Sequence, residues 1–202
     1  MKNFWDERYS AKEFIYGIKP NDFFKEQLEK MKPGKILLPG EGEGRNAVHA
    51  AKYGWDVDAI DWSHTAKEKA LKLAQENNVL INYTVKDLTE FQPEEETYDA
   101  AALIFVSFEE ELRQVIHKKV TASLKPGGKL ILEAYEKDQI KNSSGGPKDI
   151  NMLYSLEDIT GDFIDMEFEY FAKEQIYLEE SKIHHGEADV IRFVGIKSHR
   201  DG

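Results

Sequence analysis

The stretch KILLPGEGEGRNAVHAA, residues 35–51, decides the fold class of this chain. Residues 35–38 predict a short strand, three glycines then alternate with glutamates, and the small apolar residues after Arg45 recur at helical spacing. A strand that turns into a helix through glycines is typical of a βαβ unit at a ligand site. Glycine suits this turn because it accepts positive φ and lets a ligand approach the backbone.

Strands and helices continue to alternate after this stretch. The sequence predicts further short strands at residues 55–60, 80–85, 99–106 and 129–133, and helices at residues 22–31, 45–53, 65–77 and 109–124. Because βαβ units are right-handed, this order predicts a doubly wound, mostly parallel sheet with helices on both faces, an α/β fold.

The C-terminal part of the chain has a different pattern. Residues 165–178 alternate between apolar and polar side chains, and residues 188–196 form a second such run. The connector between them, residues 179–187, has no helical pattern. Two neighbouring strands without a crossover helix predict an antiparallel hairpin at the edge of the sheet.

Composition narrows the range of partners and chemistries. The 202 residues include 38 acidic and 27 basic side chains, a formal net charge of −11, which argues against nucleic acid and anionic membrane surfaces as partners. The absence of cysteine excludes disulfides, thiolate nucleophiles and Cys-ligated zinc. The histidines lack metal-ligand spacing, so no metal is expected. The N-terminus is charged and aromatic, unlike a signal peptide, which predicts a cytoplasmic protein.

The spacing of glycines and carboxylates points to a nucleoside-containing cofactor. Asp61 ends the second strand 21 residues after Gly40, where a carboxylate typically binds a ribose diol. Asp61 is expected to face a cleft, so its removal should affect the cofactor and barely change stability. Asp87 ends the third strand and is either an adenine-binding carboxylate or the start of an Asx turn.

The order GxGxG differs from the dinucleotide fingerprint GxGxxG, because position 45 is arginine and the third glycine comes one residue early. Glu41 and Glu43 would repel a pyrophosphate, whereas S-adenosylmethionine has no phosphate and has a sulfonium cation. An alternative interpretation of these glutamates is that they compensate a helix dipole. Two other functions stay open: an NAD-dependent oxidoreductase, disfavoured by this loop, and a non-catalytic cofactor-binding or scaffold protein.

The chain resembles class I S-adenosylmethionine-dependent methyltransferases, and within them the small branch related to tellurite-resistance and thiopurine-type enzymes. The resemblance covers nearly the whole chain. It rests on WDERY (5–9), YGIKPN (16–21), GEGEGRNAVHAA (40–51), WDVDAIDWS (55–63), KDL (86–88), YDAAALIFVSF (98–108), LKPGGKLILEAY (124–135), GGPKD (145–149) and the tail around Glu180, His184 and Gly186. It implies a seven-stranded Rossmann-like sheet whose last strand is antiparallel.

The resemblance also implies roles for individual residues. The cofactor-binding set would be Gly40, Glu41 and Gly42 at the methionine part, Asp61 and Trp62 at the ribose, Asp87 and Leu88 at the adenine, Ile104 and Phe105 at the methyl group, and Trp5 as part of an aromatic lid with Tyr9. The catalytic candidates are His184, Arg45 and Tyr16. Arg45 could instead form a surface salt bridge with Glu43 or Glu41.

The sequence departs from the family pattern at two positions. Leu38 stands where the family usually has an aspartate, and Glu41 stands between the first two glycines, where a small residue or cysteine is usual. Glu41 is therefore expected to take over the lost acidic function beside the cofactor's ammonium group.

These observations predict one methyltransferase domain over residues 1–202. Its parts are an N-terminal helical and aromatic cap (1–32), a cofactor-binding core (33–135), and a substrate loop with the C-terminal hairpin (136–202). The expected reaction is in-line transfer of a methyl group from S-adenosylmethionine to a small-molecule acceptor. No feature of the sequence specifies the acceptor or an oligomeric state.

Overall fold

The computed structural model describes residues 2–199, and their centre is a seven-stranded sheet with the order β3-β2-β1-β4-β5-β7-β6. The strands are β1 (Lys35–Pro39), β2 (Asp56–Asp61), β3 (Asn82–Val85), β4 (Tyr98–Ile104), β5 (Leu124–Tyr135), β6 (Met166–Ser181) and β7 (His184–Lys197). The first five strands are mutually parallel, and β7 is antiparallel to both β5 and β6. This order confirms the predicted fold class, including the antiparallel hairpin at one edge.

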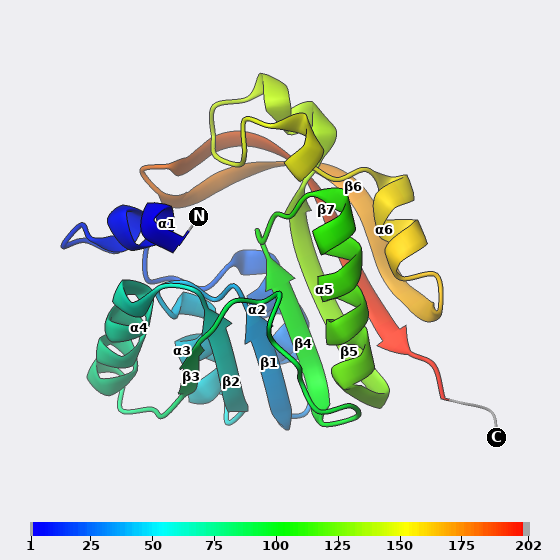
Figure 1. The fold of residues 1–202 in the computed structure, drawn as a ribbon, viewed down its shortest axis with the longest axis horizontal. Coiled ribbons are helices and arrows are strands. Elements are labelled where there is room, and N and C mark those ends of the chain that lie inside the picture. Colours follow the sequence, from blue (N-terminus) through cyan, green and yellow to red (C-terminus); the bar gives the residue numbers. More distant parts are fainter. Residues whose placement is uncertain (1, 200–202) are drawn as a thin grey trace.

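Helices cover both faces of the sheet (Figure 1). They are α1 (Lys2–Tyr9), α2 (Asp22–Glu29), α3 (Arg45–Lys52), α4 (His64–Glu76), α5 (Glu110–Ser123) and α6 (Leu156–Asp162), with 3-10 turns η1 (Lys137–Lys141) and η2 (Ile150–Met152). Among the described residues, none of these helices has the length and apolarity needed to cross a membrane.

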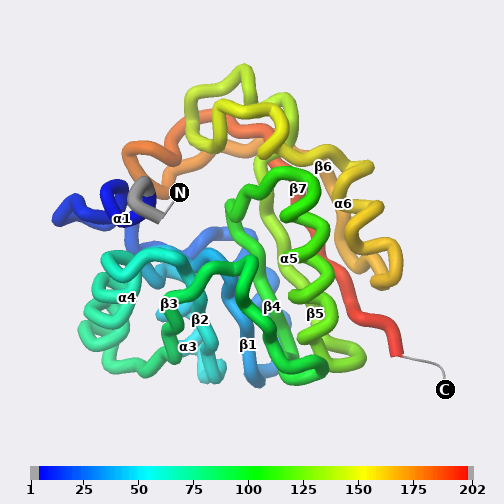
Figure 2. The backbone as a smooth tube through the Cα atoms, in the orientation of Figure 1, coloured from blue at the N-terminus to red at the C-terminus, as the bar shows by residue number. Residues whose placement is uncertain are grey.

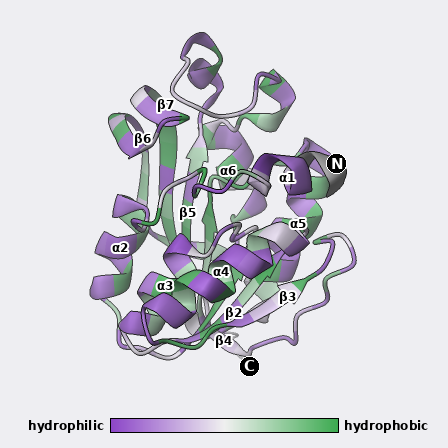
Figure 3. Ribbon diagram, turned by 90° about the vertical axis from the view of Figure 1, so that its left-hand side faces the viewer, coloured by the Kyte–Doolittle hydropathy of each residue, from purple (hydrophilic) through white to green (hydrophobic). Residues whose placement is uncertain are grey.

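The alternation of side chains along β1 explains the two layers of the core. Ile36 and Leu38 point to one face, where they pack in one apolar cluster with α2, α3 and α4. Leu37 points to the other face and joins the cluster formed with α5 and α6. All three side chains are buried, as expected for a central parallel strand covered on both sides. In Figure 3, hydrophobic residues are prominent in the strands at the centre of the sheet, whereas the helices contain many hydrophilic residues.

The C-terminal hairpin is longer than the sequence predicts. The expected connector, residues 179–187, is mostly strand, because β6 and β7 continue to pair through Glu179 with His185 and Ser181 with His184. Only residues 182 and 183 lie between the two strands. Antiparallel pairing uses backbone groups, so it continues into a polar stretch that has no apolar alternation.

The tip of this hairpin lies above the carboxyl ends of the parallel strands. In Figures 1 and 2, β6 and β7 curve over the top of the sheet toward the N-terminal segment, and residues 136–155 form the loops above them. The hairpin therefore brings the end of the chain close to the glycine turn after β1. This arrangement places residues from both ends of the sequence around one cavity.

Candidate active site

A cavity of about 670 Å³ lies at the carboxyl ends of β1, β2, β3 and β4. Its size is within the range of roughly 300–1,000 Å³ that is usual for small-molecule sites. Every residue that the sequence predicts for the site lines this cavity: Trp5, Tyr16, Gly40, Glu41, Gly42, Arg45, Asp61, Trp62, Asp87, Leu88, Ile104, Phe105 and His184. The structure therefore brings the predicted set together at the edge where α/β sheets bind ligands.

The glycine turn after β1 packs tightly against side chains from other parts of the chain. Gly40 and Gly42 have φ values of +69° and +63°. A Cβ atom on Gly40 would lie 2.8 Å from Val106, and one on Gly42 would lie 2.8 Å from the Tyr9 hydroxyl. The Tyr83 hydroxyl donates a 2.6 Å hydrogen bond to the Gly42 carbonyl. Any larger residue would strain the backbone and close this part of the cavity.

Asp61 connects the glycine turn to the end of β2. Its carboxylate accepts hydrogen bonds from the Gly42 amide at 3.0 Å and the Ser63 amide at 2.9 Å. Burial raises the pKa of Asp61, and these amides counteract part of that effect. Each oxygen can accept one more bond, so the carboxylate can still bind a diol. The expectation that Asp61 matters only for a ligand is wrong, because it also holds two buried amides.

Glu41 lies inside the turn and reaches the start of α3. Its Oε1 atom accepts hydrogen bonds from the Asn46 amide at 2.9 Å and the Ala47 amide at 2.7 Å. Burial raises the pKa of Glu41 to about 8, against the effects of the amides and Arg45. Glu41 therefore acts at the start of α3 as a hydrogen-bond acceptor for two amides. Its Oε2 atom does not take part in these bonds.

Glu43 has a different role from the one predicted. Its Oε2 atom accepts hydrogen bonds from the Ile15 and Tyr16 amides, and its Oε1 atom forms a 2.7 Å ion pair with Lys69. The side chain therefore fixes the segment before α2 over the cavity, rather than compensating a helix dipole.

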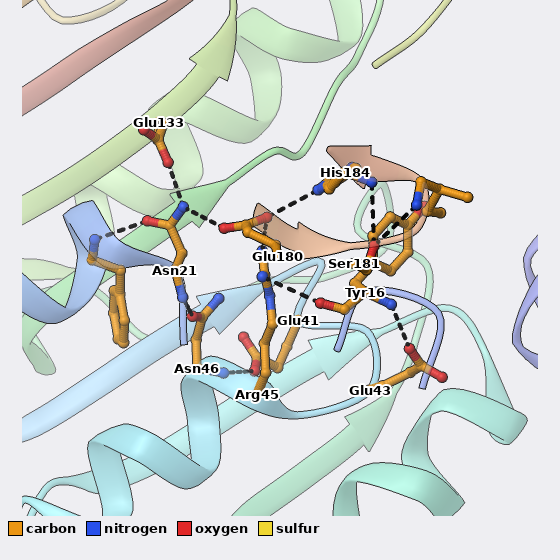
Figure 4. Close-up of polar contacts among 12 residues, drawn as sticks. Tyr16, Asn21, Glu41, Glu43, Arg45, Asn46, Glu133, Glu180, Ser181 and His184 are labelled. Atoms are coloured by element: carbon orange, nitrogen blue, oxygen red, sulfur yellow. Dashed lines mark hydrogen bonds and ion pairs between the residues drawn. The ribbon is translucent and has the colours of Figure 1, made fainter. Parts of the chain in front are cut away.

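Arg45 and His184, which both line the cavity, meet at Glu180 in the hairpin (Figure 4). The Glu180 carboxylate is 3.0 Å from Arg45 Nη2 and 3.0 Å from His184 Nδ1. Burial alone would raise the pKa of Glu180, but the hydrogen bond from His184 and the charge of Arg45 lower it to about 2. The predicted salt bridge of Arg45 with Glu43 or Glu41 is therefore wrong. The sequence shows no periodic signal for the true partner, which lies 135 residues away.

Asn21 extends this cluster to β5. Its side-chain amide donates to Glu133 and, at 3.0 Å, to Glu180. Its backbone amide donates to Asn46, while its side-chain oxygen caps α2 by accepting from Phe24. Figure 4 shows that these contacts join the N-terminal segment, α3, β5 and the hairpin. Sequence reasoning did not select Asn21, Glu133 and Glu180, although all three lie in segments that resemble the family.

Aromatic rings next to His184 also line the cavity. The Tyr16 ring lies edge-on to His184 with 4.8 Å between centroids, and Phe105 stacks on Tyr135 at 4.5 Å. Phe105 has a φ of +54°, an uncommon conformation for a bulky residue. Strain of this kind concentrates at functional sites, so the turn after β4 is a further indication of function. Tyr135, which sequence reasoning did not select, also lines the cavity.

Trp5 and Asp87, two residues of the predicted cofactor-binding set, also form contacts within the protein. Trp5 stacks on Tyr9 at 5.7 Å, so the N-terminal helix contributes two rings to the cavity. The Asp87 carboxylate accepts a 2.8 Å hydrogen bond from the Thr89 amide, which is the Asx turn considered above. Asp87 remains at the cavity and can still accept from a ligand. Within residues 2–199, no group of three His, Asp or Glu side chains is arranged to hold a metal ion.

Comparison with known families agrees with this geometry. The model of the family described as "Methyltransferase domain" matches residues 36–128, which run from β1 into β5 and include the glycine turn and Asp61. A search of curated proteins gives no match.

Solved structures match almost the whole chain at low identity. The structure solved for the conversion of a disulfide bond into a thioacetal group during echinomycin biosynthesis is 16% identical, with a TM-score of 0.81 over 100% of this chain and 93% of that one. TehB from Haemophilus influenzae is 16% identical, with a TM-score of 0.73 over 98% and 67%. The N-methyltransferase NodS from Bradyrhizobium japonicum WM9, in complex with S-adenosyl-L-homocysteine, is 13% identical, with a TM-score of 0.75 over 98% of each chain.

The structural matches establish the fold, and the family match establishes the type of core that the fold contains. The glycine turn, the carboxylate at the end of β2 and the cavity all lie within or beside the matched residues. Residues 36–128 therefore match a methyltransferase domain, within a fold shared with a methyltransferase solved in complex with S-adenosyl-L-homocysteine.

Proposed function

We propose that this enzyme methylates a small-molecule acceptor by in-line displacement, and that His184, oriented by Glu180, takes the acceptor's proton. The observation that supports this proposal is the single cavity with two unlike ends. One end has the glycine turn and buried carboxylates, and the other has aromatic rings and the histidine. A methyl donor and its acceptor need two such adjoining spaces.

The first end fits S-adenosylmethionine by its shape and charge. The glycine turn offers backbone where side chains would clash. Asp61 is buried and Glu41 is half-buried, and among the described residues neither carboxylate has a basic partner in hydrogen-bond contact. Positive charge on the ligand would offset the raised pKa values of both carboxyl groups. We assign Gly40, Gly42 and Glu41 to the methionine part, with Asp61 at the ribose.

We assign the other predicted contact residues to the remaining parts of the cofactor. Asp87 and Leu88 would border the adenine, Trp62 the ribose, and Ile104 and Phe105 the methyl group, with Trp5 as part of the lid. S-adenosylmethionine supplies an electrophilic methyl group and a neutral leaving group, so the enzyme has to orient the acceptor and remove its proton if it has one. On this basis, residues 2–32 form a cap, residues 33–135 mainly hold the cofactor, and residues 136–199 contribute to the acceptor site; residues 1 and 200–202 of the predicted parts lie outside the described residues.

The second end provides the proton acceptor. The Glu180 carboxylate lies at hydrogen-bond distance from Nδ1 of His184, so it favours the tautomer that has its proton on Nδ1. In this tautomer the lone pair is on Nε2. Among residues 2–199, Nε2 has no hydrogen-bond partner. Arg45 forms a 3.0 Å ion pair with the same Glu180 carboxylate and so fixes its position beside His184. Arg45 is thus a positioning residue, and Tyr16 holds the imidazole ring from its edge.

Calorimetry and methyl-transfer assays test this function. The protein should bind S-adenosylmethionine and S-adenosylhomocysteine, and NAD at the same concentration should give no heat of binding. Tight binding of NAD would overturn the proposal. In assays with tritiated S-adenosylmethionine and small thiols, phenols and amines, methylated product should form with at least one of these classes.

His184→Ala should lower turnover of protonated acceptors by roughly 100-fold or more, because a general base contributes about that much. Binding of S-adenosylhomocysteine should be unchanged. Pentafluorothiophenol, which is ionised at neutral pH, is the matched acceptor, and its methylation should fall much less. An equal loss for ionised and protonated acceptors would contradict a role in proton removal.

A further inference from the structure

Tyr135 has a buried hydroxyl without a partner. The residue ends β5 and is 2% exposed. Among the described residues, its hydroxyl oxygen forms no hydrogen bond. Three other buried tyrosines have hydrogen-bond partners: Tyr83 donates to Gly42, Tyr98 donates to Asp58, and Tyr154 bonds to the backbone of Val106 and Phe108. An unpaired buried hydroxyl destabilises a protein, so its presence here requires an explanation.

The surroundings of this hydroxyl belong to the acceptor end of the cavity. A Cβ atom on Gly145 would lie 2.6 Å from the Tyr135 oxygen and 2.8 Å from His184 Cδ2, the carbon bonded to Nε2. The hydroxyl and the imidazole therefore converge on the same small space. Phe105 stacks on one face of the Tyr135 ring, and the backbone of Gly145 and Gly146 covers the other.

The electrostatic surroundings keep the proton on this hydroxyl. Burial raises the pKa of Tyr135 far above its ordinary value, and the nearby charges of Glu180 and Glu133 raise it further. A hydroxyl in this environment donates a hydrogen bond and does not act as a base. Its role is therefore the opposite of the one proposed for His184.

We propose that the Tyr135 hydroxyl is a binding group for the methyl acceptor, to which it donates a hydrogen bond beside the nucleophilic atom. This inference rests on the proposed methyl transfer. It defines the acceptor as a molecule with two neighbouring groups: a nucleophile that faces His184 and an atom with a free lone pair, such as an ether or carbonyl oxygen, that faces Tyr135.

Entry of such an acceptor requires a movement of the covering loop. Gly145 and Gly146 have φ values of +132° and +82°, and Gly145 leaves no space for a side chain between the hydroxyl and the imidazole. The loop is held by side-chain bonds from Gln139 to Gly145 and from Ser144 to Glu187. Displacement of this glycine pair opens the space that the acceptor's polar atom then occupies.

Tyr135→Phe tests the proposal because it removes only the hydroxyl. The probes are pairs of equal shape that differ in one ether oxygen: 2-methoxybenzenethiol against 2-ethylbenzenethiol, and the corresponding phenols and anilines. Calorimetry measures their binding to the protein saturated with S-adenosylhomocysteine. In at least one pair, the wild type should bind the methoxy compound about 2- to 12-fold more tightly, the range for a neutral hydrogen bond, and Tyr135→Phe should abolish this preference.

Thermal unfolding supplies a second readout. Without ligand, Tyr135→Phe should leave the melting temperature unchanged or raise it, since no bond is lost. Tyr98→Phe, which removes a hydroxyl bonded to Asp58 far from the cavity, is the matched control and should lower it. A lower melting temperature for Tyr135→Phe would show a structural partner and overturn the proposal. Three other results would also overturn the proposal: none of the six probes binds, the two members of every pair bind equally tightly, or the preference for the methoxy compound persists in Tyr135→Phe. Failure of S-adenosylhomocysteine itself to bind would instead overturn the proposed function.

Discussion

Glu41 combines a helix-terminal hydrogen-bonding role with a half-buried position beside the cavity. Its Oε1 atom holds two amides of α3, and burial raises its pKa from 4.5 to about 8. In the folded state the carboxyl group keeps its proton up to about pH 8, whereas in the unfolded state it loses the proton near pH 4.5. The folded state therefore binds more protons between these values, and Glu41 makes the protein less stable as pH rises through this window.

Glu41→Gln should remove this dependence, because glutamine keeps the carbonyl oxygen but does not titrate. We expect the variant to gain stability relative to the wild type as pH rises from about 5 to about 8, and the difference to be constant above that range. Urea unfolding at a series of pH values measures it. Glu26→Gln, at an exposed helix position paired with Lys30, is the control. Parallel stability curves for wild type and Glu41→Gln would contradict a proton on Glu41.

Asp61→Ala should affect both the ligand and the fold. Each hydrogen bond to a charged group contributes roughly 1.5–3 kcal/mol, so loss of the proposed ribose contact should weaken S-adenosylhomocysteine binding on the order of 10- to 100-fold. The variant should also melt at a lower temperature, since the Gly42 and Ser63 amides lose their acceptor. Calorimetry and thermal unfolding measure the two effects separately, and an unchanged dissociation constant would remove Asp61 from the cofactor site.

At the scale of elements, one side chain binds two backbone amides of the segment before α2. Glu43 accepts from the Ile15 and Tyr16 amides and pairs with Lys69. Glu43→Ala should therefore release this segment, and amide hydrogen exchange at Ile15 and Tyr16 should become faster while exchange in β1 and β4 stays slow. Because Tyr16 lies against His184, methyl transfer should also slow. Unchanged protection of these two amides would show that other contacts hold the segment.

The helices and strands also show how much of the fold can be predicted from the sequence alone. The glycine turn and the helices after it follow local rules, so residues 35–51 are sufficient to predict a βαβ unit, and the carboxylate 21 residues after Gly40 predicts the position of Asp61. The length of the hairpin could not be predicted, because residues 179–187 are polar and their strand pairing depends on backbone bonds. The partner of Arg45 could not be predicted either, since Glu180 reaches it only through the tertiary fold.

At the scale of the whole molecule, one cavity is assembled from segments that are far apart in the chain. The N-terminal helix, the turns after β1 to β4, the glycine loop at 145–146 and the hairpin tip each contribute to its lining. Sequence reasoning found most cofactor-side residues because they follow single strands. It found fewer acceptor-side residues, since Asn21, Glu133, Tyr135 and Glu180 acquire their roles only when β5 and the hairpin meet the N-terminal segment.

The position of β7 between β5 and β6 determines the order in which the two ends of this cavity can form during synthesis. β1 to β5 and their helices are made first and pair with one another, so the glycine turn and Asp61 can be in place on the ribosome. β6 has no neighbouring strand until residues 184–197 emerge, and the edge of β5 stays open to wrong partners until then. S-adenosylmethionine bound to the nascent first half would stabilise the edge on which the acceptor half is later built.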